Sequence, residues 1–139
     1  MVVLDTNVLS EVVSPAPSER VLNWLAAIAP EQLRTTAVTQ AELLLGVGLL
    51  PQGRKRLFLA TEIERLLSET FSGRILPFDS AAARQYALIH VSRRRLGRPI
   101  GELDGQIAAI AKSHGFPLAT RNVPDFEDCA IELINPWEL

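Results

Sequence analysis

The fold of this 139-residue chain is decided by the stretch VVLDTN at residues 2–7. Its three apolar residues predict a short buried strand, and Asp5 ends that strand with a charge. An apolar run of this kind is typical of a strand in a parallel sheet that is covered on both faces. The functional crevice of such sheets lies beyond the carboxyl ends of the strands, so Asp5 stands where a site is expected.

Outward from this stretch, the chain alternates short apolar runs with longer helical patterns. Strands separated by helices imply βαβ units, and therefore an α/β fold with a parallel sheet covered on both faces. We expect one domain over residues 1–139. The predicted strands span residues 2–4, 33–38, 74–78, 117–120 and 131–134, and the predicted helices span 7–13, 18–28, 39–47, 54–71, 79–96 and 102–114.

Composition limits the possible chemistry. The single cysteine, Cys129, excludes an internal disulfide and a cysteine-rich zinc site, and the two histidines, His90 and His114, argue against a multi-histidine site. A metal would therefore be held by oxygen, which favours Mg²⁺, Mn²⁺ or Ca²⁺. We see neither a secretory leader pattern nor an apolar run of about 18 residues, so we expect a cytoplasmic protein without membrane contact.

Three acids fall where the crevice should be. Asp5 follows the first strand, Glu42 opens the helix after the second strand, and Asp104 lies in the first turn of the helix before the fourth strand. Each acid alone could be structural: Asp5 and Asp104 could serve a helix N-terminus, and Glu42 could complete a capping box with Thr39. Together they favour a divalent-cation site, because carboxylates crowded without a cation raise one another's pKa. Asp79 also precedes a helix, and we interpret it only as a cap.

Four short segments of the chain resemble motifs of a known family. The motifs are LDTNVL at 4–9, AE at 41–42, LDGQIAA at 103–109 and LATRN at 118–122. In this order they look like the PIN domain, and they are most similar to VapC-type toxins of bacterial type II toxin–antitoxin systems. The segments GRILPFD at 73–79 and NPWEL at 135–139 resemble the FitB-like branch of that family.

This resemblance implies a three-layer α/β/α sandwich with a central, mostly parallel five-stranded sheet. It also implies a Mg²⁺- or Mn²⁺-dependent endoribonuclease, a homodimer, and a small antitoxin that inhibits the enzyme. Asp5, Glu42 and Asp104 would be the catalytic, metal-binding acids. Asn7 would orient a metal-bound water or the Asp5 carboxylate, and Thr120 would support the site.

One position departs from several relatives, which carry a fourth acid where this chain has Asn122. An amide oxygen can bind a metal but brings no charge, so either Asn122 or Asp125 completes the metal site, or a water does. The departure leaves open a catalytically weak PIN-like module that acts only by binding, with its antitoxin, on DNA. A haloacid-dehalogenase-type phosphatase is disfavoured, because its second Asp is replaced by Asn7.

Two surfaces are expected to contact partners. The net charge is −2, yet residues 80–101 contain five arginines and no acid. We expect RNA phosphates to be contacted by Arg93, Arg94, Arg95, Arg98 and Arg121. For the first four of these arginines, the alternative is a solvated helix end. The apolar helical hairpin over residues 43–71 is predicted to contact the antitoxin or a second copy of the chain.

Overall fold

The computed structural model describes residues 1–139 and is built around one sheet of five parallel strands. The sheet order is β3-β2-β1-β4-β5, so β1 lies at its centre. Within the register, Val3 of β1 pairs with Arg34 of β2 and with Leu118 of β4. The predicted five-stranded sheet is confirmed. The strands are β1 (Val2–Leu4), β2 (Leu33–Thr36), β3 (Ile75–Leu76), β4 (Leu118–Ala119) and β5 (Leu133–Ile134).

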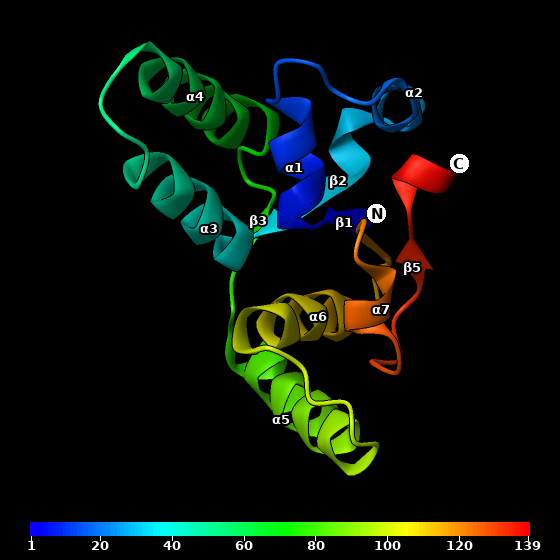
Figure 1. Ribbon diagram of the computed structural model, residues 1–139. Helices are drawn as coiled ribbons and strands as arrows, with labels where there is room; N and C mark the ends of the chain where they lie inside the picture. Colours follow the sequence, from blue (N-terminus) through cyan, green and yellow to red (C-terminus); the bar gives the residue numbers. More distant parts are fainter.

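Helices cover both faces of this sheet, which gives the predicted three layers (Figure 1). The first half of the chain forms one helical layer, with α1 (Thr6–Val12), α2 (Glu19–Ala26), α3 (Ala37–Gly48) and α4 (Arg54–Arg65). The second half forms the other layer, with α5 (Ser80–Arg95), α6 (Glu102–His114) and α7 (Val123–Phe126). A π-helical turn continues α4 over Leu66–Thr70, and 3-10 turns occupy Pro30–Gln32 and Pro136–Glu138.

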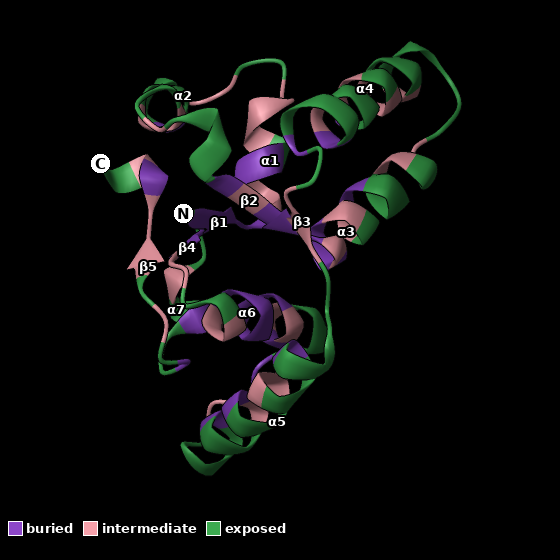
Figure 2. Ribbon diagram, turned by 180° about the vertical axis from the view of Figure 1, so that it is seen from behind, coloured by how far each residue is buried: buried purple, intermediate pink, exposed green.

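Two hydrophobic cores lie on opposite faces of the sheet. Alternate strand residues point to opposite faces, and accordingly Val3 belongs to the core under α5 and α6, whereas Val2 and Leu4 belong to the core under α1, α2 and α4. Every residue of α6 from Ile107 to Ala111 is fully buried, and Figure 2 shows purple in the middle of this helix. No helix is long and apolar enough to span a bilayer.

Most local signals in the sequence act as expected. Asp79 caps α5 by accepting a hydrogen bond from the Ala82 N–H at 2.9 Å, and Ser18 caps α2 in the same way. Gly115 ends α6 in the left-handed conformation, with φ of 69°.

The predicted capping box at the start of α3 is wrong. The helix begins at Ala37, and its cap is Thr36, whose hydroxyl accepts a hydrogen bond from the Thr39 N–H at 3.0 Å. Glu42 therefore lies in the second turn of α3 and has no capping role. The predicted strand 33–38 also extends two residues too far, because β2 runs directly into the helix and Ala37 and Val38 are the first residues of α3.

Candidate metal centre

Asp5 is fixed at the carboxyl end of β1. Its carboxylate is buried, with 4% of the residue exposed, and it caps α1 by accepting the Thr6 N–H at 2.8 Å. Its other oxygen accepts the Thr120 hydroxyl at 2.8 Å and the Asn7 side-chain N–H at 3.2 Å. Burial raises the pKa of Asp5, and the charges of Glu42 and Asp125 raise it further, while the bonds from Thr120 and Thr6 lower it.

Thr120 connects the ends of the two central strands. It follows β4, is fully buried, and donates its only hydroxyl proton to Asp5. The same oxygen accepts the Asn122 backbone N–H at 3.0 Å and the Asn7 side-chain N–H at 3.4 Å. Asn7 in turn accepts the Arg121 backbone N–H at 3.2 Å. These bonds fix the turn after β4 against the start of α1.

Glu42 reaches the same edge of the sheet from α3. Its Oε1 accepts the Thr6 hydroxyl at 2.9 Å, and Thr6 and Thr39 share a hydrogen bond of 3.0 Å between their hydroxyls. Since Thr6 donates to Glu42, the proton shared with Thr39 comes from Thr39. The sequence predicts no role for Thr6 at the site, although Thr6 lies between two predicted site residues, Asp5 and Asn7. Thr39 is predicted only as part of a capping box with Glu42, not as a partner of Thr6.

Asp104 lies in the first turn of α6 and is partly buried. Desolvation and the charges of Asp5, Asp125 and Glu42 raise its pKa to about 6, against a smaller lowering by Arg93. These charges act on Asp104 from three other segments of the chain. The structure therefore brings the predicted acids Asp5, Glu42 and Asp104 into one electrostatic neighbourhood, together with Asp125.

Asn122 and Asp125 lie on the solvent side of this cluster. Both residues are exposed; Asn122 precedes α7, and Asp125 lies in the first turn of that helix. Asn122 offers an amide oxygen, and its side chain makes no capping bond. Asp125 differs from it because its charge raises the pKa of both Asp5 and Asp104. Of the two residues proposed to complete the site, Asp125 is thus the one that interacts with the other acids.

The donor set fits a hard divalent cation, because every side chain in it offers oxygen. As the side chains stand, however, no three His, Cys, Asp or Glu residues lie close enough to hold a metal ion. The Asp5 carboxylate is held by hydrogen bonds on both oxygens, while the Asp104 carboxylate has no hydrogen-bond partner in the chain. Closing this acidic cluster (Asp5, Glu42, Asp104 and Asp125) around an ion therefore requires side-chain movement, for which Asp104 is free.

The predicted basic surface is only partly present. Arg93 is 4% exposed and donates to backbone oxygens, so its prediction as an RNA contact is wrong. Arg98 forms ion pairs with Glu127 at 3.2 Å and Asp128 at 2.7 Å. Arg94 and Arg95 are exposed on the last turn of α5. Arg121 is exposed beside the cluster and lies over the Trp137 ring, 5.2 Å from its centroid.

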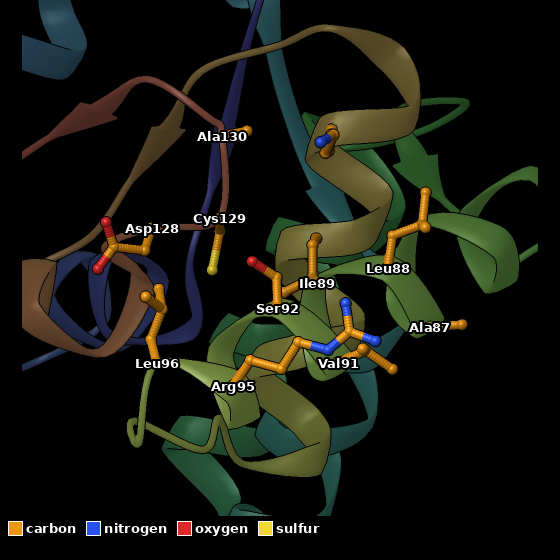
Figure 3. A pocket seen from close by; sticks show the side chains of 11 residues that line it. Ala87, Leu88, Ile89, Val91, Ser92, Arg95, Leu96, Asp128, Cys129 and Ala130 are labelled. Atoms are coloured by element: carbon orange, nitrogen blue, oxygen red, sulfur yellow. The ribbon is translucent and has the colours of Figure 1, made fainter.

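One cavity lies away from the acids. It has a volume of about 700 Å³ and is bordered by α5, the end of α6 and residues 128–130, with Asp128 as its only acidic side chain (Figure 3). A smaller cleft of about 310 Å³ runs between α1, α3 and α4 and reaches Thr6 and Glu42. This second cleft adjoins the acidic cluster and has mainly apolar walls that include Leu43, Val47 and Ile63.

Residues 2–130 match the PIN domain, and the chain belongs to that family. It is 42% identical over 138 residues to the VapC ribonuclease Y4jK of Sinorhizobium fredii, which covers 99% of both chains. It is 43% identical over 137 residues to Toxin FitB of Neisseria gonorrhoeae, again over 99% of both. It also superposes on a chain of FitAB bound to an IR36 DNA fragment, with a TM-score of 0.94, 42% identity, and coverage of 100% of this chain and 97% of that one.

Proposed function

We propose that this chain is a Mg²⁺- or Mn²⁺-dependent endoribonuclease, the toxin of a type II toxin–antitoxin pair. One observation carries the proposal: four separate segments place Asp5, Glu42, Asp104 and Asp125 in one cluster at the carboxyl edge of the sheet. A fold gains nothing from such crowding unless a cation offsets it. The full-length similarity to a protein named VapC ribonuclease supports RNA as the substrate.

In this proposal Asp5, Glu42 and Asp104 hold the ion, and Asp125 or Asn122 completes its shell. When bound, the ion lowers the pKa of a water and offsets charge on the phosphate. Thr120 and Asn7 keep the Asp5 carboxylate in one orientation through their hydrogen bonds. The exposed arginines, Arg94, Arg95 and Arg121, would contact RNA phosphates, which gives affinity without sequence choice.

The neutral residues around the acids also have a role in this proposal. Thr6 donates to Glu42 and Thr39 supports Thr6, so this pair aims the Glu42 carboxylate toward the end of β1. These bonds hold negative oxygens in place without adding positive charge that would compete with a cation. Preorganised ligands of this kind are what a metal site requires from its surrounding shell.

The test is cleavage of structured RNA by the purified chain, freed of any antitoxin, with Mg²⁺, with Mn²⁺ and with EDTA. We expect cleavage with either metal, none with EDTA, and none from Asp5→Asn. The matched control is Asp79→Asn, which makes the same chemical change at an acid that only caps α5 and should cut normally. Equal cleavage by wild type and Asp5→Asn would assign the activity to a contaminant.

The toxin role adds two partners. We propose a small, DNA-binding antitoxin and a second copy of the chain, supported by the similarity to Toxin FitB and to a FitAB–DNA complex. The hairpin of α3 and α4 leaves large apolar side chains in solvent, more than an isolated surface explains. They are Leu44, Leu45, Leu49, Leu57 and Phe58. Expression in a bacterial host should stop growth, and Asp104→Asn should relieve the arrest with the fold intact.

The second candidate is a binding module without catalysis. It is favoured by the uncharged Asn122 and by the absence of three acids already close enough to hold an ion. The two functions give opposite results in the cleavage assay. A chain that cuts no RNA with either metal, but still forms a DNA-bound complex with its antitoxin, would be a binding module without catalysis.

A further inference from the structure

Arg93 is a buried charge for which the proposed chemistry has no use. It lies in the last turn of α5, and its Nε donates to the Arg98 carbonyl at 2.7 Å. Its Nη1 donates to the carbonyls of Asp125 at 2.9 Å and Glu127 at 3.0 Å. No carboxylate pairs with it directly. A buried guanidinium is costly unless its donors are satisfied, and here its partners are main-chain oxygens, one from the loop after α5 and two from the α7 region.

The α7 region needs such outside support. Helix α7 has only four residues, too few to be stable in isolation, and no side chain caps its N-terminus. The last carbonyls of a helix have no partner within it, and a cation is favourable there. Just beyond α7, Asp128 and Ala130 adopt left-handed backbone conformations, with φ of 62° and 57°, which non-glycine residues hold only when their surroundings fix them.

We infer that Arg93 is a positioning residue: by binding the carbonyls of Asp125 and Glu127, it holds α7 so that the Asp125 carboxylate faces the acidic cluster. The inference rests on the proposed function, since it gives that cluster its fourth acid. Arg98 supports the same segment from outside, donating to the Pro124 carbonyl at 3.1 Å. The two arginines thus act on protein backbone rather than on RNA.

Arg93 also contacts the hydrophobic core on which α7 packs. It is within 3.6 Å of the Cys129 sulfur, which packs in the same core as Phe126 of α7.

The first test is amide hydrogen exchange on the metal-free full chain. We expect Arg93→Met to raise exchange at residues 123–129 by about tenfold or more while residues 107–111 of α6 stay protected. Arg93→Lys should give a smaller rise, because one ammonium cannot reach the spread set of carbonyls. The matched control is Arg84→Met, an exposed arginine of the same helix, which should exchange like wild type. Unchanged exchange at residues 123–129 in both Arg93 variants would overturn the inference.

The second test separates positioning from general stability by using Mn²⁺ affinity. We expect Arg93→Lys and Asp125→Asn each to weaken Mn²⁺ binding, by about tenfold. If Arg93 acts through Asp125, the double variant should bind no more weakly than Asp125→Asn alone. The inference would be overturned if the losses of Mn²⁺ affinity add up in the double variant, or if a folded Arg93→Lys binds Mn²⁺ like wild type. Either result would leave the proposed function standing. A wild-type chain that binds no Mn²⁺ would overturn both.

Discussion

Removing the charge of Asp104 should stabilise the metal-free protein while abolishing its activity. The neighbouring acids and burial raise the pKa of Asp104 from 3.8 to about 6. A rise of about 2 units corresponds to about 3 kcal/mol of unfavourable ionisation at neutral pH. Because Asp104 is only partly buried, solvent screens part of this, and we expect Asp104→Asn to gain about 1 kcal/mol. For a domain of this size, that gain raises Tm by about 3 to 4 °C.

The gain should depend on pH in one direction. A carboxyl whose pKa is raised by folding destabilises the protein only when it is ionised. Well below the ordinary pKa of 3.8 the group is protonated in both the folded and the unfolded chain, so wild type and Asp104→Asn should melt together. The difference should grow from pH 3.8 to about pH 6, where the carboxyl is ionised in the unfolded chain but still protonated in the folded one, and be complete above about pH 7.

Thermal melts in EDTA at several pH values measure this difference. Asp79→Asn is the control, because Asn caps a helix as well as Asp does, and its Tm should stay unchanged. Adding Mn²⁺ should reverse the order, raising the Tm of wild type above that of Asp104→Asn. A lower Tm for Asp104→Asn in EDTA at pH 7.5, or a shift that does not vary with pH, would refute the electrostatic account of the cluster.

Three further substitutions probe the site and its surroundings. Thr120→Val should reduce RNA cleavage by about 10- to 100-fold, because it removes the shorter of the two hydrogen bonds to the buried Asp5 oxygen. Thr120→Ser should restore cleavage, and equal rates for the two variants would argue against a role for the hydroxyl. Gly105→Ala should lower the free energy of unfolding, measured by urea denaturation, by about 1 to 3 kcal/mol, since the new Cβ would lie 2.9 Å from the Tyr86 ring. An unchanged free energy of unfolding would show that the ring moves freely. Leu57→Glu should prevent co-purification with the antitoxin while Tm stays the same, because Leu57 is exposed on α4. Retained binding would exclude the exposed face of the α3–α4 hairpin as the antitoxin contact.

Much of the fold is predictable because it depends on local signals. The run at residues 2–4 predicts a buried strand, the periodic apolar residues of 102–114 predict a helix, and Gly115 ends it by its left-handed conformation. The same signals place Asp5 and Asp104 at element ends, where a site of a parallel sheet forms. Their proximity to each other depends on β1 pairing with β4, which the alternation of strands and helices implies without specifying.

The parts that sequence reasoning missed depend on contacts between distant segments. The run of three arginines at 93–95 is typical of a solvated helix end, yet Arg93 is buried because its side chain reaches backbone carbonyls of α7 and of the residue after it. Burial of one arginine among three depends on an element some 30 residues away. Thr39 similarly gains its partner from residue 6, through packing of α1 against α3.

The central position of β1 has a consequence for how the protein is made. Its neighbour β4 is synthesised more than 110 residues later, and Asp104 and Asp125 emerge only with this last part of the chain. During translation the growing polypeptide therefore carries an incomplete set of acids, and every product that stops short of residue 118 lacks the strand that aligns them. The full cluster can therefore assemble only after residue 125 has been synthesised.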